Sequence, residues 1–147
     1  MTKLRALIVA SLVWVGTMGA LALTSPAGAQ GTSWTRTTTC PNGLALTLQA
    51  VDVHTRTGGS GEHAWWWVTG NVIVSAANGQ WVTEDEAYLG RDTLPAGSGG
   101  TEASGTSIEF APNGVPFLVQ GTAYLAPGGF LGRVSGTETS LCSALGG

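Results

Sequence analysis

The chain has 147 residues and a formal net charge of −3, with six basic residues against nine acidic ones. This length suits one ordinary domain that can bury a core. The shortage of basic residues excludes the lysine- and arginine-rich patches with which proteins bind nucleic acids or anionic membrane surfaces, so neither is expected as a partner.

The N-terminal segment predicts a cleaved secretory signal peptide. Lys3 and Arg5 form a basic start, a mostly apolar run covers residues 6–23, and Ala27-Gly28-Ala29 supplies the small residues of a cleavage site. The alternative is an uncleaved membrane anchor, because the apolar run approaches the length of a membrane span. Cleavage is expected directly after this small-residue motif.

The single domain expected after cleavage, residues 30–147, is acidic and free of lysine. It keeps four arginines and all nine acidic residues, which gives it a net charge of −5. Its Ala-, Gly- and Thr-rich composition is typical of a GC-rich bacterial genome. We therefore expect a secreted bacterial protein, located outside the cell and free of the membrane once residues 1–29 are removed.

Cys40 and Cys142 are the two cysteines of the chain, and a secreted protein meets an oxidising environment. Only one intramolecular pairing exists, so we expect a Cys40–Cys142 disulfide. Two free thiols or an intermolecular bridge are the alternatives. The bridge would close a loop over nearly the whole domain, which the chain-entropy model credits with about 4–5 kcal/mol of stabilisation.

Turn signals and β-rich runs alternate along the domain, and helical periodicity is absent. Asn78-Gly79 and Asn113-Gly114 are strong hairpin turns, and Pro127-Gly128-Gly129 is a further turn. These signals predict an all-β fold. The expected strands are 44–54, 64–76, 81–90, 105–111, 115–126 and 130–141, and residues 32–39 are a candidate for one more.

The turns also predict how the strands pair. A two-residue loop at Asn78-Gly79 would place Ala77 opposite Gln80, with Trp66 and Asp85 on the core face. The same loop length at Asn113-Gly114 would place Phe110 opposite Phe117. A four-residue turn over 126–129 would place Leu125 opposite Phe130.

The disulfide and the meander together predict how the sheet is arranged. Cys40 precedes the first strand of the main series and Cys142 follows the last, so a bridge between them would bring these strands edge to edge. An antiparallel meander of about six to eight strands would then close into a small barrel. A two-sheet β-sandwich is the second interpretation.

Three consecutive tryptophans, Trp65, Trp66 and Trp67, raise the question of a binding surface. Side chains alternate between the faces of a strand, so Trp66 is expected in the core and its two neighbours on the opposite face. An exposed aromatic surface can bind sugars or apolar ligands, unless a loop such as 92–104 covers it. The predicted ligand-binding residues are Trp65, Trp67, Tyr88, Glu84 and Glu86, with Val51 and Val53 as further neighbours.

Asp52, His54, Glu62 and His63 flank the loop over residues 55–61. Carboxylates and imidazoles can run acid–base chemistry or bind a metal, but only if they converge. Polar ends of a solvated loop are the simpler interpretation. No cofactor and no resident metal are expected.

These observations support three hypotheses about function. The first is a secreted, non-enzymatic β-domain that binds an extracellular glycan, a small apolar molecule or a protein. The second is a small secreted hydrolase or isomerase that uses Asp52, His54 and His63. The third is a structural or surface protein without a ligand.

Overall fold

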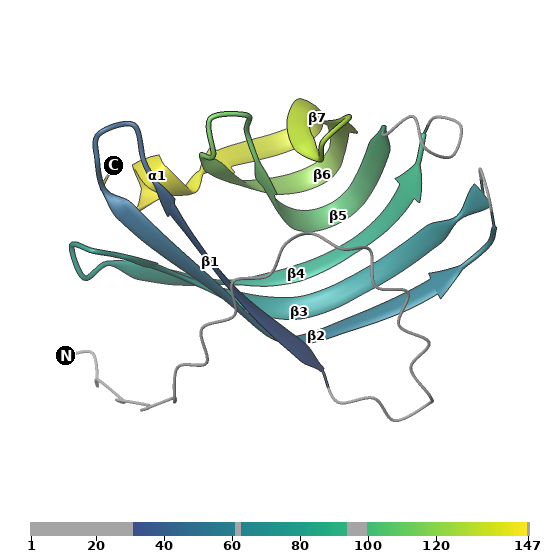
Figure 1. The fold of residues 1–147 in the computed structure, drawn as a ribbon, viewed down its shortest axis with the longest axis horizontal. Coiled ribbons are helices and arrows are strands. Elements are labelled where there is room, and N and C mark those ends of the chain that lie inside the picture. The colour runs from purple at the N-terminus through teal and green to yellow at the C-terminus, as the bar shows by residue number, and fades with distance from the viewer. Residues whose placement is uncertain (1–30, 61–62, 94–99, 147) are drawn as a thin grey trace.

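The computed structural model describes residues 31–60, 63–93 and 100–146, and the predicted signal peptide lies outside these ranges. No helix within them is long and apolar enough to cross a membrane. Seven strands and one short helix make up the fold (Figure 1). They are β1 (Thr32–Thr39), β2 (Ala45–Gly58), β3 (Trp65–Ala76), β4 (Trp81–Asp92), β5 (Thr101–Phe110), β6 (Pro116–Ala126), β7 (Phe130–Ser140) and α1 (Leu141–Ala144).

The seven strands form one antiparallel sheet in which the strand order follows the sequence from β1 to β7. The predicted all-β meander is thus confirmed. Closure into a barrel is not confirmed, because β1 and β7 are the edges of this sheet and are not paired with each other. The single sheet also differs from a sandwich of two. Figure 1 shows that it is strongly curved, with β6 and β7 turned over the trough that β2 to β5 form.

The predicted disulfide joins Cys40 and Cys142, whose Cα atoms are 5.7 Å apart. Cys40 lies in the turn between β1 and β2, where its N–H donates to the carbonyl of Leu44 (2.8 Å). Cys142 lies in α1, beyond the end of β7. The bridge therefore fastens this turn to the helix, and it does not require the two edge strands to pair.

The β3–β4 turn has one residue more than the sequence predicts. The N–H of Ala76 donates to the carbonyl of Gln80 (2.8 Å), which leaves Ala77, Asn78 and Gly79 as a three-residue loop. Asn78 Oδ1 accepts the N–H of Gln80 (3.0 Å), and Gly79 adopts a φ of 87°. This is a type I turn followed by a left-handed glycine. The predicted pairing of Ala77 with Gln80 is therefore wrong by one residue.

This shift reverses the faces of β4, because the side chains of a strand alternate. Val72 pairs with Glu84, and Gly70 pairs with Glu86, so both glutamates lie on the face of the buried β3 residues. Asp85, expected inside, is exposed on the other side. The prediction that Glu84 and Glu86 point outward is thus wrong. The inner face of the sheet is defined here as the face that carries the buried side chains of β2 and β3, and the outer face is the opposite one. These buried side chains are Leu46, Leu48, Ala50, Val72 and Val74.

The two later hairpins also have three-residue loops, so their registers differ from those expected. Phe110 pairs with Pro116, where Phe117 was expected. Phe130 pairs with Ala126, where Leu125 was expected. The β5–β6 loop is therefore one residue longer than the sequence predicts, and the β6–β7 loop is one residue shorter.

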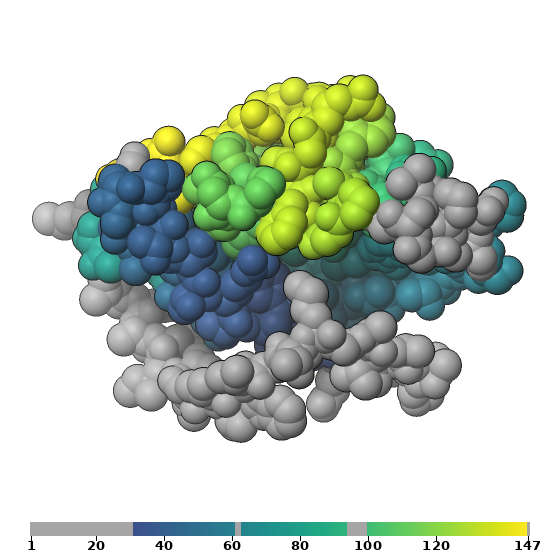
Figure 2. Space-filling model, turned by 45° about the horizontal axis from the view of Figure 1, so that its top comes forward, coloured from purple at the N-terminus to yellow at the C-terminus, as the bar shows by residue number. Residues whose placement is uncertain are grey.

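The main core lies at the end of the sheet that carries the disulfide. There β4 and β5 part after the pair Ala87–Thr106, and the β5–β6 hairpin packs on the inner faces of β2 and β3. Edge strand β1 contacts this hairpin. Thr38 Oγ1 donates to the carbonyl of Gly114 (2.7 Å), and Figure 2 shows β1, in blue, against the green turn. Core members from the separate elements are Leu46, Leu48, Val72, Val74, Ile108, Phe110, Leu141 and Leu145.

Three glycines shape the bend in β5, β6 and β7. Gly105 pairs with Gly121, which pairs with Gly136, so they form a row across the strands. Their φ angles are 137°, 138° and 133°, a backbone region that residues with a Cβ rarely adopt. A Cβ on Gly121 would overlap the carbonyl oxygen of Ser135. Aligned glycine kinks of this kind let a sheet curve sharply.

Candidate functional site

The three consecutive tryptophans of β3 divide between the faces of the sheet. Trp65 and Trp67 are 40% and 39% exposed, whereas Trp66 between them is partly buried on the inner face. The alternation predicted from the strand period therefore holds, although Trp66, expected in the core, belongs to neither core cluster. Two large aromatic side chains lie two residues apart on the outer face, about 7 Å along the strand.

The neighbours of Trp65 and Trp67 differ from those expected. Trp65 pairs with Gly58 on β2 and Arg91 on β4. Trp67 pairs with Arg56 and Leu89. The additional residue in the β3–β4 turn accounts for the β4 neighbours.

A β-bulge accounts for the β2 neighbours. The register of β2 against β3 shifts between Val51 and His54, and Asp52 in this bulge has a φ of 52°. The extra residue moves the following part of β2 along β3. Val51 pairs with Asn71, away from the tryptophans, so Val51 and Val53 are not their neighbours.

Two glycines on the adjacent strands leave space for the consecutive indoles of Trp65 and Trp66. A Cβ on Gly58 would overlap the Trp65 ring on the outer face, and a Cβ on Gly90 would overlap the Trp66 ring on the inner face. Each indole thus occupies space that only a glycine on the adjacent strand leaves free. A side chain at position 58 or 90 would therefore displace the neighbouring ring.

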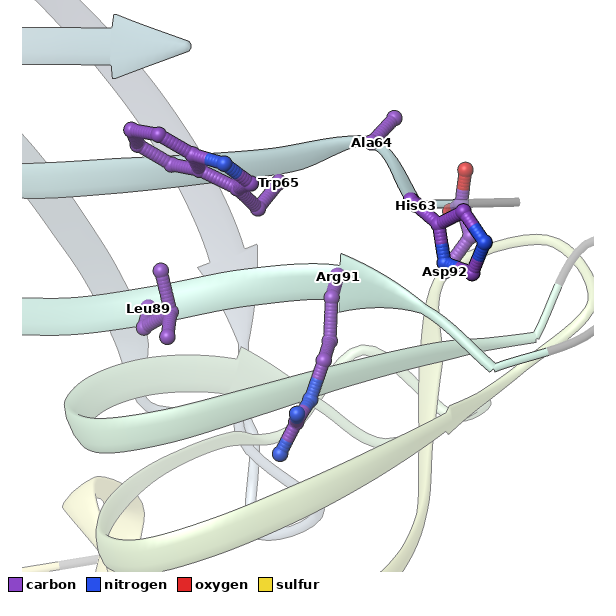
Figure 3. Close-up of a pocket in the computed structure, with 6 residues that line it drawn as sticks. All are labelled: His63, Ala64, Trp65, Leu89, Arg91 and Asp92. Carbon is purple, nitrogen blue, oxygen red and sulfur yellow. The ribbon is translucent and has the colours of Figure 1, made fainter. Parts of the chain in front are cut away.

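A pocket of about 420 Å³ opens beside Trp65, at the end of the sheet opposite the disulfide (Figure 3). Its volume falls within the range of roughly 300–1,000 Å³ that small-molecule sites occupy. The apolar part comes from Ala64, Trp65 and Leu89. The lining is completed by His63, Arg91 and Asp92.

The cation of the pocket is neutralised by a carboxylate. Nε and Nη2 of Arg91 both donate to Glu102 Oε1, at 3.0 and 2.6 Å. The Glu102 side chain is only 16% exposed, and Ser104 Oγ also donates to it (3.4 Å). In Figure 3 the Arg91 side chain runs away from Trp65. This pairing fixes the guanidinium and reduces its attraction for an anionic ligand.

Tyr88, Glu84 and Glu86, predicted beside the outer tryptophans, lie on the inner face and form no common surface with them. Glu86 is buried, and its Oε1 accepts the N–H of Ile108 (2.8 Å) where β4 and β5 part. Burial raises the pKa of Glu86, and this hydrogen bond from Ile108 partly opposes the rise. The Glu86 carboxylate thus accepts the Ile108 N–H in place of a backbone carbonyl of β4, at the point where the pairing of β4 with β5 ends.

Glu109 on β5 adds a second acidic group to this part of the inner face. Burial raises its pKa to about 7; a hydrogen bond from Ser107 opposes the rise, and the nearby Glu86 adds to it. Burial, and then the charges of Glu86 and Glu109, also raise the pKa of Tyr88. These groups affect stability as the pH changes, and they lie apart from the pocket.

Asp52, His54 and His63 are all exposed, and they are spread along the sheet. His54 pairs with Thr69, four residues or about 13 Å along β3 from Trp65, whereas His63 precedes the start of β3. No cluster of three or more metal-ligating side chains occurs in the described ranges. Glu62 lies outside them. The two imidazoles thus do not converge on one site.

Sequence reasoning missed the residues on β4 that complete the pocket, Leu89, Arg91 and Asp92. The available signal was the turn at residues 76–80. Asn-Gly also occurs in three-residue hairpin loops, and that loop length places Trp65 opposite Arg91.

No family model matches the chain, and no match is found among curated proteins or among solved structures. The candidate site therefore rests on the geometry of this chain.

Proposed function

We propose that this protein is a secreted, non-enzymatic binding domain whose outer face binds an extracellular ligand beside Trp65. The observation that carries the proposal is the pocket next to the exposed indole of Trp65, for which Gly58 leaves space on β2. Trp67 extends the same aromatic surface. Of the three expected ligand classes, a glycan or a small apolar molecule suits a concave pocket of this size better than a protein does.

Binding accounts for exposed tryptophans better than a purely structural role. Trp65 is 40% exposed and also lines a pocket, and this combination, more than exposure alone, favours a ligand, because Trp81 is 64% exposed and does not line this pocket. Covering Trp65 with the chain's own residues would release water from this apolar surface. The exposure of Trp65 beside the pocket therefore favours a surface that a ligand covers.

An enzyme is the weaker alternative. Acid–base catalysis needs its groups within hydrogen-bond reach of one reacting centre. The separation of His54 from His63 argues against a shared site for them and Asp52. Secretion is supported by the N-terminal sequence pattern and by the disulfide, which is typical of oxidising compartments.

The test is calorimetric titration of the purified, disulfide-bonded protein with three probes. These are cellohexaose, an oligogalacturonate of equal length, and the apolar dye N-phenyl-1-naphthylamine. Trp65→Ala should weaken binding of a probe about tenfold, because a stacked aromatic contributes on the order of 1 kcal/mol.

Trp81→Ala is the matched control. Trp81 is 64% exposed on the same face, but ten residues of β3, about 33 Å, separate its partner Ser75 from Trp65. This variant should bind like the wild type. Binding of no probe, or binding that survives Trp65→Ala unchanged, would contradict the proposal.

A further inference from the structure

We infer that the ligand of the Trp65 pocket is a neutral saccharide, with one sugar ring stacked on the indole. This inference rests on the proposed function, because it names the class of ligand for the same site. It follows from the exposed ring, the charges of the lining and the direction in which the aromatic surface continues.

The stacking surface is the part of Trp65 that the sheet leaves free. Gly58 allows the ring to lie against the backbone of β2, and 40% of the residue is still exposed. The C–H groups on one side of a pyranose pack well on an aromatic ring, while its hydroxyl groups point outward to polar partners. The ring lies along β2, so its free side can face a ligand in the pocket.

The polar lining suits hydroxyl groups better than a carboxylate, sulfate or phosphate. Arg91 already pairs with Glu102 at 2.6 Å, and Asp92 contributes a further acidic group to the lining. An anionic ligand would therefore meet one compensated cation and one carboxylate. A sugar hydroxyl both donates and accepts, so it can bond to His63, to Asp92 or to an Arg91 N–H that does not face Glu102.

The lining also disfavours a purely apolar ligand. Such a molecule would bury part of His63 and Asp92 without offering either a hydrogen bond, which costs free energy. Trp67 continues the aromatic surface two residues along β3, beyond Trp65. A saccharide chain can follow this line from the pocket across the outer face.

The experiment measures the affinity of the wild-type protein for each of the three probes. The same titrations are carried out with Trp65→Ala and Trp81→Ala. Cellohexaose should bind at least about tenfold more tightly than the oligogalacturonate or the dye, and Trp65→Ala should remove most of this binding. Tighter binding of the charged sugar or of the dye, lost in Trp65→Ala, would overturn the inference and leave the proposed function intact. Binding of no probe would overturn both.

Glu102→Gln tests the charge argument separately. The substitution keeps the size of the side chain but releases Arg91 from its anionic partner. Affinity for the oligogalacturonate should rise about tenfold, as for a newly available charge-assisted contact, while affinity for cellohexaose stays the same. If the charged sugar binds no better to this variant, the pairing of Arg91 is not what sets the preference, and the inference fails on this point.

Discussion

The Trp65 indole lies where a Cβ of residue 58 would be, and Gly58 leaves that space free. The overlapping atoms belong to a side chain, so an added methyl group would push the indole aside while the backbone stays in place. Gly58→Ala should therefore weaken ligand binding about tenfold with a loss of stability of only about 1 kcal/mol.

Calorimetric titration and urea unfolding measure the two effects of Gly58→Ala. Gly132→Ala on β7 is the control, because its Cβ would come no closer than 3.2 Å to any atom, the carbonyl oxygen of Tyr124. A variant at position 58 that binds as well as the control would show that the placement of the indole does not matter.

The glycine row across β5, β6 and β7 should be sensitive to any side chain. Gly121→Ala places a Cβ against the Ser135 carbonyl at a φ of 138°, so we expect a loss of about 2–4 kcal/mol. Gly129→Ala also has a positive φ, 77°, but nothing lies within 4 Å of its Cβ, so the loss should be about 1 kcal/mol. Urea unfolding checks the order; equal losses would mean that backbone conformation alone, without the overlap, sets the cost.

Stability should fall as the pH rises from about 4.5 to about 7. Burial raises the pKa of Glu109 from 4.5 to about 7, so in this interval the folded protein holds a proton that the unfolded chain releases. The expected loss from Glu109 is about 3 kcal/mol, nearly complete at about pH 8. Glu109→Gln should reduce this dependence and stabilise the protein at pH 8, and the part that remains belongs to Glu86, whose pKa is also raised by burial.

Urea unfolding at pH 5 and pH 8 measures this effect. Glu138→Gln serves as the control, because Glu138 is exposed on β7, so the variant should keep the wild-type dependence on pH. Stability that rises between pH 5 and pH 8 in the wild type would contradict the assigned sign.

Glu86 should matter through the hydrogen bond that it accepts from Ile108. Glu86→Ala leaves this buried N–H without its acceptor, which should cost about 1–3 kcal/mol and speed hydrogen exchange at the Ile108 amide. Glu86→Gln keeps an amide oxygen at that position and should preserve protection of the amide. Unchanged exchange in Glu86→Ala would show that another group satisfies Ile108.

The strands could be predicted from the sequence because their signals are local, and the disulfide because two cysteines allow only one intramolecular pairing. Alternation within β3 was enough to place Trp65 and Trp67 outside, whatever strand lies beside them. Their neighbours depend on the turn at residues 77–79 and on the bulge at Asp52, and one residue at either point reverses a face. This is why the pocket residues on β4 were missed and Glu86 was placed on the wrong side.

Barrel closure could not be predicted from the disulfide alone. Cys142 follows β7 but does not extend it, because four residues, Leu141–Ala144, form α1 instead. Ser140 begins this helix, with its Oγ accepting the N–H of Ser143 (3.3 Å). The cysteines therefore meet through the helix while β1 and β7 remain edges.

The most direct test of the Trp65 site is a titration followed by the indole N–H signals in ¹H–¹⁵N NMR spectra, with cellohexaose as the probe. Substitution of each tryptophan by phenylalanine assigns the signals. The Trp65 signal should shift most as the sugar is added, with a smaller shift for Trp67 and none for Trp81. A Trp65 signal that stays in place while another tryptophan responds, or while the sugar binds by calorimetry, would contradict a binding site at this pocket.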